Sequence, residues 1–297
     1  MTPRVAIATT AGVGDEWPDD AILAGELGGL GAEAAVEPWD GDAQWSAYDL
    51  VVVRSTWDYT WRREEFLAWA DRVGPRLRNS PELLRWNSDK RYLADLGDAG
   101  IPVVPTVFAG PGDPPPALSG EIVVKPAVSA GARLTGRFGP GTHGAARGLL
   151  EEIRAEGGTA MVQPYLESAD TGGETAVVFI GGRRAHVLHK KAVLSPDEVA
   201  PMREGGIAAA EAMFLEDLVT AGAAGPQELE LAERVVGFCT ERFGRAPLYA
   251  RVDMLEGPGG APVLLELEAV EPNLYLETAP EAAGTLARAI LAEATPR

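Results

Sequence analysis

Cysteine and histidine are scarce in this chain of 297 residues, and their scarcity excludes several kinds of site. Cys239 is the only cysteine, so neither an intrachain disulfide framework nor a cysteine-rich metal centre can form. There are only three histidines, and His186 and His189 have a spacing that is poor for joint metal binding on a strand. A metal site in this chain is therefore expected to use oxygen ligands.

Basic residues and long apolar runs are also few. Forty-four acidic residues against 26 basic ones give a formal net charge of −18, which disfavours nucleic acid and anionic membranes as partners. No apolar stretch approaches membrane-spanning length, and Val5 to Thr9 reads as a strand with no signal peptide before it. We therefore predict a cytoplasmic location, and any anionic ligand would need a local cationic pocket.

The usual nucleotide-binding motifs are missing or weak. The sequence contains no Gly-Lys dipeptide, which excludes a Walker A loop. Residues 139–144 have the letters of the dinucleotide fingerprint, but Pro140 interrupts them and no buried strand comes directly before. After the first predicted strand, Trp17 stands where the third glycine of that fingerprint belongs. A Rossmann cofactor site is therefore not expected.

Near the C-terminus, residues 251–254 and 264–268 read as two strands joined by a glycine-rich turn. Side chains alternate faces along a strand, so Glu266 and Glu268 share a face, and the hairpin places Asp253 roughly opposite them. Such an all-oxygen cluster suits Mg2+. The alternative is an exposed acidic edge strand, which the apolar neighbours on both strands disfavour.

Two lysines and one apolar strand form a second set of candidates. Lys125 ends an apolar strand just before the small-residue loop 129–132, whose backbone could approach phosphates closely, and Lys90 lies in the first turn of a predicted helix. Residues 160–167 have the look of a hinge strand whose backbone could hold an adenine edge, with Glu167 near a ribose. A surface position is the alternative for either lysine.

The ordered series resembles the ATP-grasp ligases over roughly residues 80 to 280. The elements that carry the resemblance are Lys90, Lys125, Gln163 to Glu167, Glu174, Arg251 to Asp253, and Glu266 to Glu268. The resemblance implies α/β and α+β units: an N-terminal α/β domain over 1–80, a central lobe over 81–162, and a C-terminal lobe with the metal site over 163–297. The two lobes would clasp ATP.

The resemblance also implies a role for each matching residue. Lys90 and Lys125 would bind ATP phosphates, and Gln163, Pro164, Tyr165 and Leu166 would meet adenine, with Glu167 or Glu174 at the ribose. Asp253, Glu266 and Glu268 would hold Mg2+. Arg251, which we place on the opposite strand face, would stabilise the transferred phosphate if the strand twists or bulges. Two departures stand out: Glu268 stands where many members have Asn, and Ser129, Ala130 and Ala132 stand where glycines are common.

A second distinctive run, residues 51–59, lies at the carboxyl end of a predicted parallel strand, where open α/β sheets bind ligands. Arg54 could clamp a carboxylate, Asp58 could accept hydrogen bonds from an amine, and Trp57 and Tyr59 could wall the pocket. Asn273 follows the hairpin closely enough to join this substrate site. The alternative is that the run packs between domains.

This run, the chain length and the Glu-Leu-Glu strand are similar to the small ATP-grasp enzymes of cycloserine biosynthesis. The resemblance implies ATP-dependent phosphorylation of a carboxylate and ring closure of O-ureidoserine to cycloserine, with ATP and Mg2+ as cofactors. The expected partner is a small amino-acid-like substrate, and self-association is left open. Intermolecular amino-acid or dipeptide ligation, a phosphotransferase that stops at the acyl phosphate, and a non-catalytic nucleotide-binding regulator are the alternatives.

Overall fold

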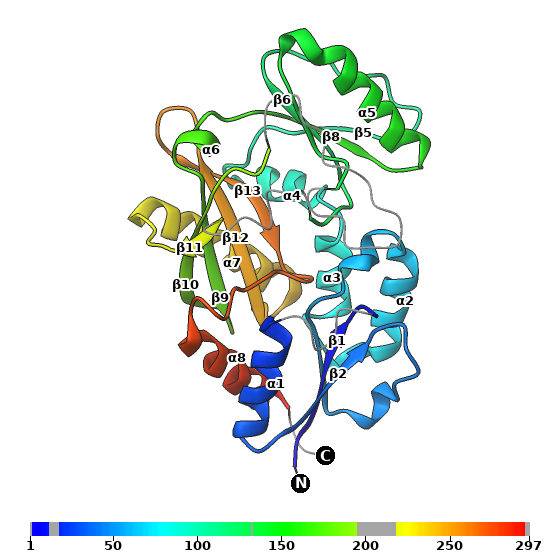
Figure 1. Ribbon diagram of the computed structural model, residues 1–297, viewed down its shortest axis with the longest axis vertical. Helices are drawn as coiled ribbons and strands as arrows, with labels where there is room; N and C mark the ends of the chain where they lie inside the picture. The colour runs from blue at the N-terminus through cyan, green and yellow to red at the C-terminus, as the bar shows by residue number, and fades with distance from the viewer. Residues whose placement is uncertain (1, 12–17, 132, 195–217, 295–297) are drawn as a thin grey trace.

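Three β-sheets with their covering helices make up the structure, a computed structural model that describes residues 2–11, 18–131, 133–194 and 218–294. In Figure 1 a four-stranded sheet with α5 lies at the top, a five-stranded sheet lies below it, and the N-terminal sheet lies at the bottom beside α1 and α8. No helix of the described residues is long and apolar enough to cross a membrane.

The N-terminal sheet is parallel, with the strand order β2-β1-β3-β4. Its strands β1 and β3 are buried on both faces, as expected for apolar runs in a parallel sheet that helices cover on each side. The elements of this unit are β1 (Arg4–Thr9), α1 (Pro18–Gly29), β2 (Glu33–Pro38), η2 (Trp45–Ala47), β3 (Leu50–Val53), η3 (Trp57–Thr60), α2 (Arg63–Val73), η4 (Gly74–Arg76) and β4 (Leu77–Arg78).

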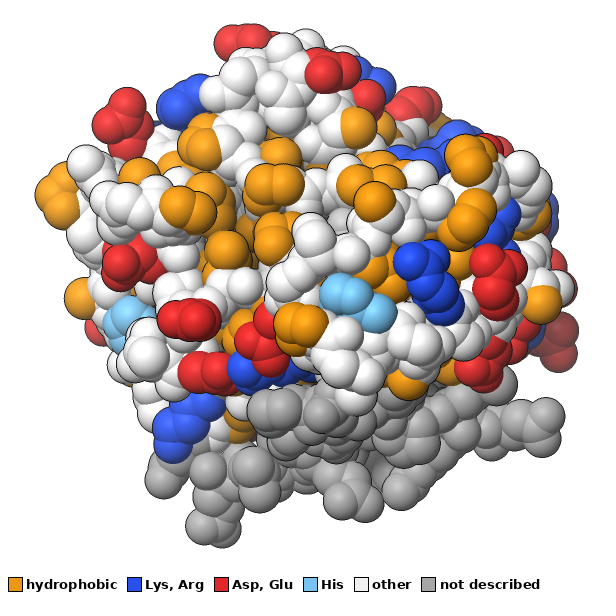
Figure 2. All heavy atoms as spheres, turned by 90° about the horizontal axis from the view of Figure 1, so that it is seen from above, with side chains coloured by type: hydrophobic (Ala, Val, Ile, Leu, Met, Phe, Trp, Pro, Cys, Tyr) orange, Lys and Arg blue, Asp and Glu red, His pale blue; other side chains and the backbone are white. Residues whose placement is uncertain are grey.

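The four-stranded antiparallel sheet has the order β5-β8-β6-β7 and its own apolar core against one long helix. That helix, α5, turns Leu149, Leu150 and Ile153 toward Val124 and Val162 of the sheet. The elements are β5 (Val107–Ala109), β6 (Ile122–Pro126), β7 (Gly136–Phe138), η5 (Pro140–Thr142), α5 (His143–Ala155) and β8 (Ala160–Pro164). Acidic, basic and apolar side chains are interspersed on the face seen from above (Figure 2).

The five-stranded antiparallel sheet has the order β11-β10-β9-β12-β13. Gly173, just before β9, has a φ of +71°, and its backbone packs so closely on Lys190 that a Cβ there would collide with the Lys190 carbonyl oxygen. The elements are α6 (Ser168–Thr171), β9 (Glu174–Ile180), β10 (Arg183–Lys190), β11 (Val219–Ala221), α7 (Pro226–Phe243), β12 (Tyr249–Glu256), β13 (Pro262–Glu268) and α8 (Pro280–Glu293).

Helices bury both faces of this sheet, and they also join it to the N-terminal unit. One face packs on α7 and on two short helices, α3 (Pro81–Asn87) and α4 (Tyr92–Asp98). The other face shares a core with the N-terminal sheet, in which Leu27 of α1 and Leu286 of α8 lie between them. The predicted boundary between the two lobes, at 162/163, falls inside β8. The central lobe was predicted to begin at residue 81, and residues 81–98 pack on the five-stranded sheet.

Candidate active site

The β12–β13 hairpin gathers its acidic side chains on one face. Asp253 pairs with Glu266 across the ladder, and Arg251 pairs with Glu268. A register shift follows Asp253, so one extra residue of β13 is accommodated without moving the acidic positions off this face. Val252 and Leu267 point the other way, into the core with α7. The strand pairing therefore places the three carboxylates on one face of the hairpin.

Arg251 lies on the same face as Asp253, and our placement of it on the opposite face was wrong. Residues two apart on a strand share a face, so no twist is required to bring them together. The Arg251 guanidinium donates to Asp253 through Nε at 2.8 Å and Nη2 at 2.9 Å, to Glu268, and through Nη1 to the Asn273 carbonyl oxygen at 2.8 Å. The Arg251 side chain is almost fully buried, and these partners engage its guanidinium.

Lys190 is a functional candidate to which the sequence analysis gave no role. It comes from β10, and its Nζ lies 2.7 Å from Glu174 Oε2 and 2.8 Å from Asp253 Oδ2. Burial opposes ionisation of Asp253, but Arg251 and Lys190 outweigh burial and hold the pKa of Asp253 below its usual value. Only the pairing of β10 with β9 and of β9 with β12 brings Lys190 to this carboxylate.

The remaining oxygens of the face suit a Mg2+ ion held by two carboxylates. Among the described residues, no three or more His, Cys, Asp or Glu side chains form a ready metal cluster, and Arg251 and Lys190 both engage Asp253. Glu266 and Glu268 each bond a cation through one oxygen, and within the described chain their second oxygens have no partner. Mg2+ commonly takes one or two carboxylates and completes its shell with phosphates and water. Asp253, which Arg251 and Lys190 engage, stays a predicted third ligand.

Charge balance at these two glutamates differs. Burial opposes ionisation of Glu266, but Lys90 at 3.0 Å and nearby Lys125 lower its pKa. Burial raises the pKa of Glu268 to about 7; Arg251 opposes this, while Asp253 and Glu266 add to it. A divalent cation beside Glu268 would offset that excess of negative charge.

Both predicted phosphate-binding lysines face this set of charges. Lys90 is buried, and its Nζ also donates to the Ser129 carbonyl oxygen at 2.7 Å, which ties it to the small-residue loop. Lys125 lies on β6 opposite Met161 and has no ion pair among the described residues. Burial lowers the pKa of Lys125, although Glu266 partly compensates. Ala132 of the loop lies outside the described residues.

The predicted adenine segment leaves β8 with one free backbone donor. The Tyr165 N–H donates to the Glu121 carbonyl oxygen at 2.8 Å, whereas the Leu166 N–H has no partner within the described chain. Gln163 is buried and its Nε2 bonds the Thr106 hydroxyl at 2.9 Å, while Pro164 is exposed. Leu166 is thus the position of this segment that can donate to an adenine ring nitrogen.

The two glutamates predicted for the ribose differ in their surroundings. Glu167 is exposed, at the start of α6 directly after the hinge segment. Glu174 lies beside the face of the hairpin that carries Arg251, Asp253, Glu266 and Glu268, which we call the charged face, and it forms an ion pair with Lys190. Of the two, Glu167 therefore has a carboxylate ready to accept from a ribose hydroxyl.

The side chains of the run from Arg54 to Tyr59 contact different parts of the molecule. Arg54 is buried, and its Nη2 donates to the Pro272 carbonyl oxygen at 2.9 Å. Asp58 accepts from Trp39 Nε1 at 2.8 Å and from Arg62, so both of its oxygens have donors. Tyr59 is buried and packs on Phe66, with ring centroids 5.2 Å apart. Trp57 is partly buried.

Residues 271–276, which follow β13, are held by both units through their backbone. His186 Nε2 bonds the Leu274 carbonyl oxygen at 2.8 Å, and the Asp19 carboxylate accepts from the N–H groups of Leu274 and Leu276 at 3.1 and 2.8 Å. Asn273 Oδ1 accepts from the Tyr275 N–H at 2.9 Å, and Tyr275 has a φ of +51°. This segment, 271–276, links the charged face to the N-terminal sheet.

The sequence places this chain in a known family. Residues 5–79 match the family described as D-cycloserine synthetase DcsG, N-terminal domain. Over 281 residues the chain is 34% identical to the cycloserine biosynthesis protein DcsG of Streptomyces lavendulae, and the match covers 90% of this chain and 91% of the relative. The chain belongs to the DcsG family.

Solved structures agree with this assignment to the DcsG family. A crystal structure of D-cycloserine synthetase DcsG has a TM-score of 0.84 at 30% identity and covers 98% of this chain and 100% of that chain. D-alanine–D-alanine ligase from Bacillus anthracis complexed with ATP has a TM-score of 0.66 at 12% identity, with 99% and 97% covered, a likeness of fold alone. The fold is that of the ATP-grasp ligases, as predicted, and the chain is an ATP-dependent ligase.

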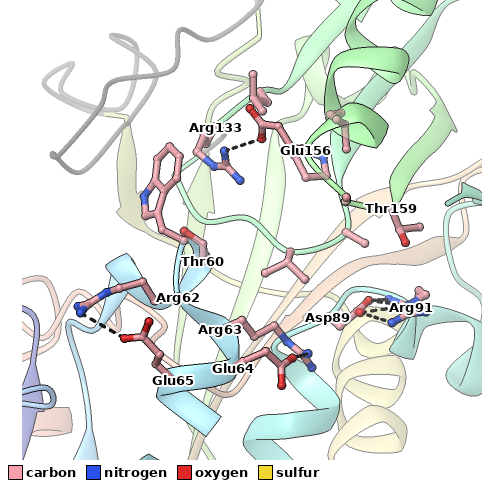
Figure 3. A pocket seen from close by; sticks show the side chains of 18 residues that line it. Thr60, Arg62, Arg63, Glu64, Glu65, Asp89, Arg91, Arg133, Glu156 and Thr159 are labelled. Carbon is pink, nitrogen blue, oxygen red and sulfur yellow. Dashed lines mark hydrogen bonds and ion pairs between the residues drawn. The ribbon is translucent and has the colours of Figure 1, made fainter. Parts of the chain in front are cut away.

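A hollow of about 580 Å3 lies elsewhere in this DcsG-family chain, between the start of α2, the residues after β6 and the end of α5. None of the predicted site residues lines it. Figure 3 shows charged side chains around it that meet one another, such as Arg133 with Glu156 and Arg91 with Asp89. Because those charges are already paired, the hollow offers an anionic nucleotide less than the face with Lys125 does.

Proposed function

We propose that this ligase uses ATP and Mg2+ to close O-ureidoserine into cycloserine. The observation that carries the proposal is the meeting of two charged sets: Glu266 and Glu268 on β13, and the phosphate-binding candidates Lys90 and Lys125 opposite them. The name of the 34% identical relative supports the cycloserine product. The reaction belongs in the cytoplasm, where ATP is supplied.

Activation of the substrate is the part of the reaction that this face serves. A carboxylate is a poor acyl donor because its leaving group would be oxide, and transfer of the γ-phosphoryl group converts that oxygen into part of a phosphate leaving group. Mg2+ would neutralise phosphate charge between Glu266, Glu268 and ATP. Lys90 and Lys125 would bind the phosphate oxygens, and Arg251 would stabilise the group in transit once it exchanges a carboxylate partner for phosphate.

Ring closure needs no nucleophilic side chain from the protein. The oxyamine nitrogen of the substrate attacks the acyl-phosphate carbon, a carbon–nitrogen bond forms, and phosphate leaves with the former carboxylate oxygen. Water then removes the carbamoyl group as carbon dioxide and ammonia. The protein contributes position, because an intramolecular attack gains most from a substrate held in the reacting conformation.

Nucleotide recognition is proposed to use the hinge after β8. The Leu166 N–H would donate to adenine and Glu167 would accept from the ribose, while Glu174 keeps Lys190 in place beside Asp253. The substrate would lie between this nucleotide and residues 272–274, beside Arg54 and Asn273.

A substrate screen with mass analysis tests the function. ADP release with O-ureidoserine as the only amine, together with a cycloserine product, is the expected result. A condensed pair of amino acids would instead assign intermolecular ligation. ADP release that leaves an acyl phosphate, with no amide product even when an amine is added, would assign a phosphotransferase. No ADP release with any carboxylate would leave a nucleotide-binding regulator and overturn the proposal.

A further inference from the structure

A buried set of polar groups lies where β1 and β3 end and α1 begins. Asp20 and Thr56 are fully buried and Arg54 is 2% exposed. Asp20 Oδ1, Arg54 Nε, Arg54 Nη1 and Thr56 Oγ1 have no hydrogen-bond partner among the described residues. Leaving such a group without a partner costs about 1–3 kcal/mol, so four together suggest that a bound molecule completes them.

The free oxygen of Asp20 is held in place by its neighbours. Asp20 Oδ2 accepts from the Ser55 hydroxyl, and Ser55 Oγ lies 2.8 Å from Thr9 Oγ1 at the end of β1. This chain of hydroxyls fixes the carboxylate plane and leaves Oδ1 without a donor among the described residues. The carboxylate is therefore a preformed acceptor.

The charge of the set calls for one more cation. Asp19 lies 3.5 Å from Arg54 and pairs with it, whereas Asp20 forms no ion pair within the described part of the chain. The set of Asp19, Asp20 and Arg54 therefore carries a net negative charge. Burial raises the pKa of Asp20 to about 6, although Arg54 and Ser55 oppose this. The ammonium group of a bound molecule, placed beside Asp20, would offset this negative charge.

The set is also close to the proposed reaction centre. Arg54 bonds the carbonyl oxygen of Pro272, and Arg251 of the charged face bonds the carbonyl oxygen of the next residue, Asn273. Consecutive residues are about 3.8 Å apart at Cα, so the two arginines hold neighbouring carbonyls of the same segment, 271–276. Asp58, which we first considered for an amine, already has donors on both oxygens.

We propose that Asp20 and Arg54 form a head-group subsite for an α-amino acid, in which Asp20 Oδ1 accepts hydrogen bonds from the substrate ammonium. The free N–H groups of Arg54 donate to an oxygen of the same molecule. The inference rests on the proposed function, since it concerns the substrate of that ligase. Asp20 acts as a specificity-determining residue that distinguishes amine-bearing carboxylates from those without an amine.

The test compares O-ureidoserine with its deamino analogue, which keeps the carboxylate and the ureidooxy chain. In the wild-type protein kcat/KM for ADP release should be higher for the amine-bearing compound. Asp20→Asn should lower that value roughly 10- to 100-fold while leaving the analogue and the ATP Kd unchanged. The exposed Asp42→Asn is the matched control and should change neither substrate.

Two further measurements keep the outcome decisive. If Asp20→Asn does not fold, Ser55→Ala removes the hydroxyl that orients Asp20 and should reduce the preference for the amine in the same direction. Equal losses for both compounds would make Asp20 a packing residue and overturn the inference. If the wild-type protein releases no ADP with O-ureidoserine, the proposed function fails. The inference is then tested with a carboxylate that the protein does accept, by comparing it with its analogue that lacks the amine. Equal kcat/KM for the two compounds would overturn the inference.

Discussion

The β12–β13 hairpin and the run from Arg54 to Tyr59 both stand out in the sequence as polar residues within apolar surroundings, yet the structure treats them differently. The hairpin collects Arg251, Asp253, Glu266 and Glu268 on one face. The run sends its side chains to separate places, with Arg54 toward residue 272 and Tyr59 into the core beside α2.

The difference comes from the backbone. In a strand the period of two fixes which side chains share a face, so a motif with that spacing can be interpreted directly. Residues 57–60 form a 3-10 turn, in which consecutive side chains point in different directions and meet whatever packs on them. A run of polar residues therefore predicts which side chains lie together only when the run belongs to a regular strand or helix.

The largest effect is expected for Glu266→Gln, which tests the role of the hairpin carboxylates. The change removes an anionic ligand for Mg2+ and the partner of Lys90, so we expect turnover to fall by about 100-fold or more with the fold intact. ADP release across a Mg2+ titration and far-UV circular dichroism measure the two effects. The exposed Glu256→Gln at the end of β12 is the control, and near-normal activity of Glu266→Gln at limiting Mg2+ would refute the metal role.

Lys125→Met examines whether the lobe that faces the hairpin binds phosphate. Lys125 has no carboxylate within salt-bridge distance among the described residues, so its charge is available to ATP, and we expect the ATP Kd to rise about 10-fold or more. Calorimetric titration with a non-hydrolysable ATP analogue measures this. Lys191→Met, at an exposed position, should bind as the wild type does; the same Kd for both variants would remove Lys125 from the site.

Asp58→Ala examines the other half of the comparison. It removes the acceptor of Trp39 and the partner of Arg62, and we expect the free energy of unfolding to fall by about 1–2 kcal/mol while kcat/KM stays unchanged. Asp58→Asn keeps an acceptor for Trp39 and should cost less. Urea unfolding and steady-state kinetics are compared at a temperature well below unfolding. A raised KM in a stable Asp58→Asn variant would return amine binding to Asp58.

Glu271, which lies between the two regions, is expected to make the stability of the protein depend on pH. Burial, with Glu268 nearby, raises the pKa of Glu271 from 4.5 to about 8. The folded protein thus keeps a proton that the unfolded chain releases, so the free energy of unfolding falls as pH rises from about 4.5 to about 8. Glu271→Gln should be more stable than the wild type at pH 8.5 and equal to it at pH 4. Equal stability at both values would show that Glu271 is not perturbed.

The sequence allowed prediction of the fold family and of the shared face of Glu266 and Glu268, because both depend on local patterns. The ordered motifs indicated an ATP-grasp ligase, and the alternation around Glu266 and Glu268 placed them together. Lys190 was not assigned because it reaches Asp253 only through two strand pairings that join residues 63 positions apart. Asp20 was not identified because no pattern in the sequence near it indicates that it lies close to Arg54.

By itself, the sequence determined the alternation of strands and helices, the shared face of Glu266 and Glu268 and, because it has one cysteine, the impossibility of an intrachain disulfide. These follow from backbone periodicity and from composition, which are properties of short segments. Only the tertiary structure decided which charges neutralise one another, such as Lys90 with Glu266 and Asp19 with Arg54. Ion pairing and burial depend on distances between segments far apart in the chain, and the packing of the three sheets sets those distances.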